Sequence, residues 1–242
     1  MRLVLLGPPG AGKGTQAKYL ERRYCIPHIS TGEILRQAIA KGSHLGSEAA
    51  RYMNQGRLVP DPLILDIVHE RLSQPDCVPG YILDGFPRTI EQARRFDTLL
   101  EEIARPLDAV ISLEVRLEMF VKRLSARRVC SGCGVVYNVL TNPPQRDGFC
   151  DTCGGRLTQR PDDVEETIQK RFEIYRHETS YIKSFYTSKG LLGEIDGEGT
   201  VEEVHERVVT NSVHITSDKP VLVAQYANSA DFDSVTNSDP FM

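Results

Sequence analysis

The sequence of 242 residues contains no tryptophan, and aromatic residues make up only 7% of it. No apolar run approaches the roughly 18 residues that a membrane helix needs, and Gly7 and Pro8 end the first apolar stretch too early for a signal peptide. Positive charge is not in excess, since 29 Lys and Arg face 33 Asp and Glu. We therefore expect a cytoplasmic protein without a membrane or nucleic-acid partner, although a local basic cleft remains compatible with this balance.

The remaining composition is ordinary for a globular protein, with 40% hydrophobic and 26% charged residues. The length allows one or two domains with a sizeable core. Of the six cysteines, Cys25 and Cys77 stand alone and the other four form two close pairs. Because the chain has no export signal and is not small, the pairs indicate a metal site rather than disulfides.

Apolar runs alternate with helical patterns along most of the chain. Buried strands are predicted by short apolar runs at residues 3–6, 81–83, 109–111 and 191–195. Helices are predicted by periodicity or start signals at residues 13–24, at Asp61-Pro62, at Thr89-x-x-Gln92 and over residues 164–186. This order predicts an α/β fold in which helices flank a parallel sheet.

Two segments interrupt the alternation and are interpreted as insertions on a core of residues 1–29, 60–125 and 164–210. Residues 30–59 predict two short helices, with Ser30-x-x-Glu33 as a capping box and glycine stops at Gly42 and Gly56. Residues 126–163 are rich in Cys, Gly and Pro and show little helical period. We call these two segments the flap and the lid.

The composition changes again over residues 211–242, which are rich in Asn, Ser and Asp and poor in Lys and Arg. A flexible extension is the simplest interpretation. The alternative is a pair of strands at residues 213–216 and 221–226.

Residues 7–15, with the sequence GPPGAGKGT, stand between the first predicted strand and the first predicted helix. Glycines let backbone N–H groups converge on a polyphosphate, and the helix N-terminus adds partial positive charge. Lys13 supplies a full charge for the β- and γ-phosphates. Gly14 occupies the position where Ser or Thr usually binds magnesium, so we expect Thr15 to supply the hydroxyl. The segment predicts a P-loop.

Four stretches together resemble the adenylate kinases of the bacterial long form, which carry a zinc-binding lid. They are residues 7–15, Ser30-Thr31-Gly32 with Arg36, Asp84-Gly85-Phe86-Pro87-Arg88-Thr89 with Gln92, and Arg127-Arg128 followed by the cysteine pairs. The resemblance covers roughly residues 1–210. It implies a P-loop core with a nucleoside-monophosphate-binding flap and a lid, and reversible Mg²⁺-dependent transfer of a phosphoryl group (ATP + AMP = 2 ADP) for nucleotide homeostasis. We expect a monomer.

The resemblance also assigns roles to residues. It implies catalytic roles for Lys13, Arg88, Arg123, Arg127, Arg160 and Arg171. It implies ATP contacts at Gly10, Ala11, Gly12, Lys13, Gly14, Thr15, Arg127, Val136, Tyr137 and Gly199. It implies AMP contacts at Thr31, Arg36, Arg57, Leu58, Val59, Gly85, Phe86, Pro87, Arg88, Gln92, Arg160 and Arg171.

In phosphoryl transfer the protein mainly positions the substrates and neutralises their charge. Several arginines suit this task, because a planar guanidinium group can bind phosphate through two hydrogen bonds. Asp84 ends a predicted strand beside the P-loop and is expected to hold Mg²⁺ through water, or else to cap the next turn. Gln92 offers a donor and an acceptor to a purine edge, with helix capping as its other role. Asp162 and Asp163 match family acids near the lid hinge, or cap the next helix.

The spacing Cys130-x2-Cys133, sixteen residues, then Cys150-x2-Cys153 fits a four-thiolate zinc ribbon. Four cysteine ligands leave no open coordination position, so a structural Zn²⁺ is expected to hold together a lid too small to fold alone. Disulfides and iron are the alternatives. Two other functions stay open on the sequence: a zinc-ribbon nucleic-acid-binding ATPase or regulatory module, and a kinase for another nucleoside monophosphate.

Overall fold

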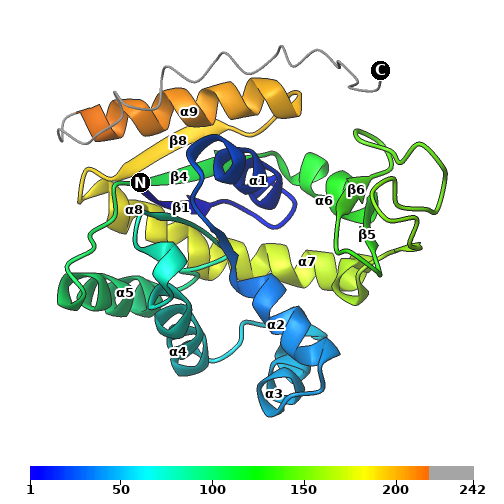
Figure 1. Ribbon diagram of the computed structural model, residues 1–242, viewed down its shortest axis with the longest axis horizontal. Coiled ribbons are helices and arrows are strands. Elements are labelled where there is room, and N and C mark those ends of the chain that lie inside the picture. Colours follow the sequence, from blue (N-terminus) through cyan, green and yellow to red (C-terminus); the bar gives the residue numbers. More distant parts are fainter. Residues whose placement is uncertain (218–242) are drawn as a thin grey trace, which may run out of the picture.

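The core of the computed structural model, which describes residues 1–217, is a five-stranded parallel sheet with strand order β2-β3-β1-β4-β8 (Figure 1). The strands are β1 (Arg2–Leu6), β2 (His28–Ser30), β3 (Tyr81–Asp84), β4 (Ala109–Glu114) and β8 (Leu192–Asp196). The predicted parallel sheet and its four predicted strands are confirmed. Strand β2 has only three residues, too few to stand out as an apolar run.

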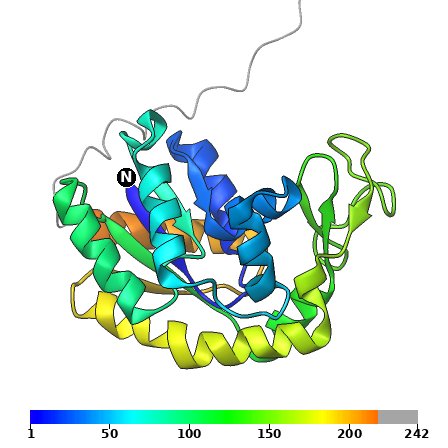
Figure 2. The same cartoon turned by 90° about the horizontal axis from the view of Figure 1, so that it is seen from below.

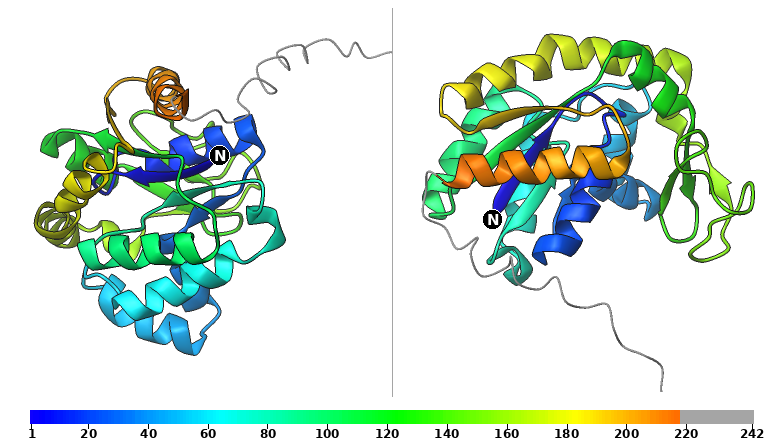
Figure 3. Two further views of the ribbon diagram at one scale, coloured as in Figure 1. Left: turned by 90° about the vertical axis from the view of Figure 1, so that its left-hand side faces the viewer. Right: turned by 90° about the horizontal axis from the view of Figure 1, so that it is seen from above.

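Helices cover both faces of the sheet because the strands bury side chains on both sides. On β1, Leu3 and Leu5 pack toward α1 (Lys13–Tyr24) and α9 (Val201–Ser217). The alternate residues Val4 and Leu6 join a cluster built with α4 (Asp61–Leu72), α5 (Ile90–Glu102) and α8 (Ser180–Thr187). Figure 3 shows α9 and the long α7–α8 ribbon on different sides of the strands.

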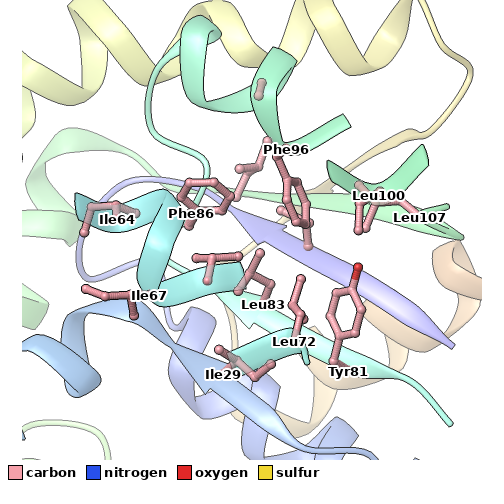
Figure 4. Packing of buried hydrophobic residues seen from close by; sticks show 14 of the residues in the cluster. Ile29, Ile64, Ile67, Leu72, Tyr81, Leu83, Phe86, Phe96, Leu100 and Leu107 are labelled. Carbon is pink, nitrogen blue, oxygen red and sulfur yellow. The ribbon is translucent and has the colours of Figure 1, made fainter. Parts of the chain in front are cut away.

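The larger cluster fixes the loop that follows β3 (Figure 4). Phe86 is fully buried and meets Phe96 of α5 edge to face, with ring centroids 5.2 Å apart. Leu83 and Leu72 close the same cluster. Residues 84–89 are therefore anchored in the core by Phe86, which holds their polar members at the sheet edge.

The flap folds as the two predicted helices, α2 (Thr31–Ala40) and α3 (His44–Met53). The predicted capping box at Ser30 is wrong, because the Ser30 side chain makes no capping hydrogen bond. Glu33 instead forms an ion pair with Arg36 at 3.1 Å, one turn along α2. Competition from a nearby cation explains why the carboxylate does not reach back to the helix start.

The lid follows α6 (Leu117–Ser125) and contains a small antiparallel sheet with order β6-β5-β7. Its strands are β5 (Arg127–Cys130), β6 (Val136–Asn138) and β7 (Leu157–Thr158). Figures 1 and 2 show the lid and the α2–α3 pair projecting separately from the core. The fold is thus the P-loop core with two insertions.

The predicted continuous helix over residues 164–186 is interrupted. It consists of α7 (Glu165–Ile174), a π-helical segment (Tyr175–Thr179) and α8. Val164, placed on the predicted buried stripe, is the N-cap of α7 and 51% exposed. The wider π turn shifts the helix register between the two halves, which an apolar stripe alone does not reveal.

Helix α9 continues to Ser217, past the expected core boundary at residue 210. The alternative strand at residues 213–216 is therefore wrong, while residues 221–226 lie outside the described part of the chain. Within the described residues, no helix combines the length and apolar character needed to cross a membrane.

Candidate functional site

The P-loop connects the C-terminal end of β1 to the first turn of α1, as predicted. Gly7, Gly10 and Gly12 have φ angles of 132°, 81° and 97°, a region that favours glycine. At Gly7 a Cβ would also lie 2.5 Å from the Leu113 carbonyl oxygen of β4. The loop can therefore approach the neighbouring strand only without a side chain there.

Lys13 lies at the start of α1 and folds back over this loop. Its ammonium donates to the carbonyl oxygens of Gly7 and Pro8, both at 2.9 Å. Burial lowers the pKa of Lys13 to about 8, and Arg88 and Arg171 add to the effect while Asp84 opposes it. A cation destabilised in this way favours the arrival of an anion, which offsets the repulsion.

The predicted arginines converge from segments that are distant in the sequence. Burial lowers the pKa of Arg88 to about 10, and Arg171 and Arg36 add to the effect while Asp84 opposes it. Burial lowers the pKa of Arg160 to about 10 as well, and Arg36 and Arg127 contribute. The loop after β3, the flap, the lid and α7 therefore all bring positive charge to one place.

Two acidic residues between lid and core hold part of this cluster. Asp163 is 1% exposed and accepts from Arg127 Nε at 2.7 Å and from Arg171 at 3.2 Å. Asp162 accepts from Arg171 at 3.0 Å. The alternative of helix capping is wrong, because α7 has Val164 as its N-cap and no side-chain cap. These aspartates instead fix the arginine forks.

Arg123, on α6, connects the P-loop to the segment that precedes α9. Its guanidinium donates to the carbonyl oxygens of Ala11 at 3.3 Å and Gly197 at 3.0 Å. Gly199 follows in the same connection with φ 118°, and Gln16 of α1 donates to the Val201 carbonyl oxygen at 2.9 Å. The P-loop and the segment before α9 therefore form one wall.

A pocket opens between the flap and the core. Nine of the twelve residues expected to contact AMP line it: Thr31, Arg36, Arg57, Leu58, Val59, Gly85, Arg88, Gln92 and Arg171. Arg160 lies nearby, 3.5 Å from the carboxylate of Glu33, whereas Phe86 and Pro87 do not line the pocket. The Phe86 side chain belongs to the core.

Gln92 lies in the first turn of α5 and does not complete the predicted capping box. The Thr89 hydroxyl accepts from the Gln92 backbone N–H at 3.1 Å, as a cap should. The Gln92 side chain, however, accepts from the Arg88 backbone N–H at 2.7 Å and donates to Asp61 at 2.6 Å. Its carboxamide thus belongs to the pocket wall.

Asp84 ends β3 beside the first turn of α1, where a Cβ on Gly14 would lie 3.4 Å from its Oδ2. Burial acts to raise the pKa of Asp84, but His28 and Lys13 outweigh it and hold that pKa below its ordinary value. The Nε2 atom of His28 lies 3.6 Å from Oδ2. The exposed Thr15 hydroxyl follows on α1, so hard oxygen donors suited to Mg²⁺ are present.

The four paired cysteines come together in the lid. Their Sγ atoms all lie within 4.8 Å of one another, with Cys130 and Cys153 at 3.4 Å and Cys133 and Cys150 at 3.5 Å. A tetrahedral site with Zn–S bonds of about 2.3 Å requires similar separations, so the cluster fits zinc. Backbone N–H groups of Gly132 and Cys133 point at the Cys130 sulfur, at 3.3 and 3.5 Å.

Tyr137, expected over the ATP base, is turned into the lid. It is 6% exposed, and its hydroxyl lies 3.5 Å from the Cys150 sulfur and accepts from the Asp151 backbone N–H. This hydrogen bond from Tyr137 lowers the pKa of Cys150 to about 6. Its neighbour Val136 is 37% exposed, so of these two residues only Val136 exposes its side chain on the lid surface.

The family of this P-loop protein is decided by comparison with known sequences. A family profile described as adenylate kinase matches residues 5–191. The chain belongs to the adenylate kinase family. An adenylate kinase of Archaeoglobus fulgidus is 50% identical over 208 residues, covering 86% of this chain and 96% of its own length. One of Thermodesulfovibrio yellowstonii is 51% identical over 208 residues, covering 86% and 97%.

Membership of the adenylate kinase family agrees with the four stretches recognised in the sequence, but two parts of this site were not found there. His28, on the short strand β2, stands against Asp84. Asp61 binds Gln92 and Thr89, although its sequence context suggested only a helix start. Both contacts join residues from separate elements, and a local pattern carries no signal for them.

Asp163 provides a test of how the arginine cluster is held. Replacing a buried carboxylate that binds two guanidinium groups leaves those charges uncompensated, so Asp163→Ala should destabilise the fold by about 3–5 kcal/mol. Urea unfolding would measure the loss. The exposed lid residue Asp147 supplies the control, since Asp147→Ala should stay within about 0.5 kcal/mol of the wild type. An Asp163→Ala protein as stable as that control would contradict this role.

Proposed function

We propose that this adenylate kinase family member catalyses the reversible reaction ATP + AMP = 2 ADP with Mg²⁺. The observation that carries the proposal is the convergence of Lys13 and arginines between a P-loop and the pocket that the flap forms with the core. The named relatives support the same activity. Ten ATP contacts are assigned to Gly10, Ala11, Gly12, Lys13, Gly14, Thr15, Arg127, Val136, Tyr137 and Gly199, with the last three acting through backbone or apolar surface.

The AMP side takes the pocket residues together with Arg160. Arg36 and Arg88 carry the charge that an AMP phosphate needs, and Arg171 lines the pocket between them and the lid. Thr179, from the π-helical segment, donates to the Arg88 backbone carbonyl at 3.1 Å. Arg88 also donates through Nε to the Gly85 carbonyl oxygen at 2.7 Å, so its fork is oriented before any nucleotide binds.

In the proposed reaction a phosphate oxygen of AMP attacks the γ-phosphorus of ATP. One P–O bond forms there as the bond to the β–γ bridging oxygen breaks, and that oxygen leaves with ADP. Lys13, Arg123 and Arg127 are placed to neutralise charge on the donor, while Arg88, Arg160 and Arg171 do so from the acceptor side. Asp84 and Thr15 would hold Mg²⁺, which supplies further charge neutralisation across the β- and γ-phosphates.

Closure of the lid and flap would exclude water from this reaction. One ion pair, at 3.5 Å, already links Arg160 near the end of the lid segment to Glu33 of the flap. We also propose a cytoplasmic location, because all six cysteines are without disulfide bonds and such thiols persist in a reducing compartment.

Steady-state turnover tests this proposal. The purified enzyme with Mg-ATP and AMP should form two ADP for each ATP consumed, in a coupled assay. Lys13→Met should reduce kcat by at least about 1000-fold, since a full charge on the transferring group is lost. The exposed Lys18 of α1 is the matched control, and Lys18→Met should leave kcat within about twofold.

Turnover with another nucleoside monophosphate but not with AMP would move the enzyme to a neighbouring kinase activity. Retained activity in Lys13→Met would contradict the role of Lys13. Both results are distinguishable in one panel of monophosphates at fixed Mg-ATP.

We propose that Cys130, Cys133, Cys150 and Cys153 hold a structural Zn²⁺. Elemental analysis should then find about one zinc per chain, and chelation should lower the melting temperature because metal binding supplies folding free energy to the lid. Iron in the metal analysis would change the assignment. An unchanged melting temperature after verified loss of metal would reject the structural role.

A further inference from the structure

The carboxamide of Gln92 is held at both of its ends. Its Nε2 donates to Asp61 Oδ1 at 2.6 Å, and its Oε1 accepts from the Arg88 backbone N–H at 2.7 Å. Gln92 is 2% exposed and lines the pocket between flap and core. These two contacts use one N–H and one lone pair, which leaves one of each for a bound base.

The partners determine which way the carboxamide points. A carboxylate such as Asp61 can only accept a hydrogen bond, and a backbone N–H such as that of Arg88 can only donate one. Rotating the Gln92 amide by 180° would place its carbonyl oxygen against a carboxylate and its NH₂ against an N–H. Both contacts would become repulsive, so the amide is locked in a single orientation.

Asp61 is itself held firmly in place. It is the first residue of α4, and its other oxygen, Oδ2, accepts from the Thr89 hydroxyl at 3.0 Å. Thr89 in turn caps α5, which carries Gln92. The carboxylate therefore links the starts of α4 and α5. Rotation of the Gln92 amide would break its hydrogen bond to this fixed carboxylate.

A locked amide distinguishes two classes of purine. Adenine places an N6 amino donor beside a ring-nitrogen acceptor, N1 or N7, and so matches one carbonyl and one N–H of a glutamine. A 6-oxopurine such as hypoxanthine has an acceptor at position 6, and its N1 carries a hydrogen. With the ribose and phosphate held as in AMP, its Watson–Crick edge therefore fits only the reversed amide, and its N7 edge, with two acceptors, fits neither orientation.

From these contacts we propose that Asp61 is a specificity-determining positioning residue, which locks Gln92 so that the pocket accepts 6-aminopurine monophosphates and rejects 6-oxopurine ones. The inference rests on the proposed AMP site and adds to it the residue that fixes its selectivity. Asp61 does not touch the substrate in this account; it acts through Gln92.

The test measures kcat/KM for AMP and for inosine monophosphate at fixed Mg-ATP. Asp61→Ala removes one of the two contacts that orient the amide and leaves only the Arg88 N–H to oppose its reversal. It should therefore raise the ratio of the inosine to the adenosine value by about tenfold or more. Asp61→Asn keeps an oxygen that accepts from Gln92 and an NH₂ that can donate to Thr89. It should therefore retain the wild-type ratio within about twofold, although the charge is lost.

The exposed Asp66 of α4 is the matched control, and Asp66→Ala should leave both values unchanged. Should Asp61→Ala fail to fold, Asp61→Ser keeps a residue that helix starts tolerate and should relax the ratio similarly. A purely structural role for Asp61 would lower both substrates together and leave the ratio constant, which would overturn the proposal.

An Asp61→Asn ratio relaxed as far as that of Asp61→Ala would also overturn it, since charge rather than orientation would then matter. If the wild-type enzyme does not phosphorylate AMP at all, the proposed function fails. Normal AMP turnover with an unmoved ratio defeats only the role of Asp61.

Discussion

The burial of several cations close together is the strongest constraint on this structure. Lys13, Arg88 and Arg160 all have pKa values lowered by burial and, to a lesser extent, by neighbouring arginines. Such a cluster is costly to assemble in a folded chain and becomes favourable when polyphosphate charge enters it. Asp162 and Asp163 stabilise part of it without filling the phosphate positions. The free energy of nucleotide binding is therefore largely prepared in advance by the fold.

Parallel strand pairing explains why these groups meet. Strands β1 and β3 are neighbours, with Leu5 opposite Asp84, so the P-loop that starts at Gly7 and the loop after Asp84 leave the sheet at the same edge. Phe86 anchors the second loop in the core. The flap and the lid then bring Arg36 and Arg160 over this edge from outside, which gives a rigid floor and two projecting walls.

The sequence predicted the parallel core, the P-loop and the cysteine cluster, because each depends on local patterns: apolar runs, glycines at a strand–helix junction, and fixed Cys spacing. It did not predict β2, which is too short, or the π-helical segment, whose register shift an apolar stripe does not reveal. Asp163 was interpreted as a possible cap and Tyr137 as a nucleotide contact. Asp163 binds Arg127 and Arg171, and the Tyr137 hydroxyl lies beside the Cys150 sulfur, both contacts that only the tertiary structure brings about.

The Asp61–Gln92 contact shows the same limit from another direction. Asp61 followed by Pro62 is a good helix start, and Thr89-x-x-Gln92 is a good helix cap. Each pattern was correct about where a helix begins and was silent about the hydrogen bond between the two starts. Side chains at helix termini can serve both local structure and a binding pocket, and the second use depends on packing.

We expect the cation cluster around Lys13 to bind polyphosphate. Calorimetric titration with the bisubstrate mimic diadenosine pentaphosphate measures this binding. Burial lowers the pKa of Lys13 to about 8 in the free enzyme, and bound phosphate should raise it again, so binding near pH 8 should be accompanied by proton uptake at Lys13. Titrations at pH 8 in two buffers of different ionisation enthalpy should show tight one-to-one binding with proton uptake, and Lys13→Met should abolish that uptake. Absence of binding, or binding without proton uptake, would contradict the account.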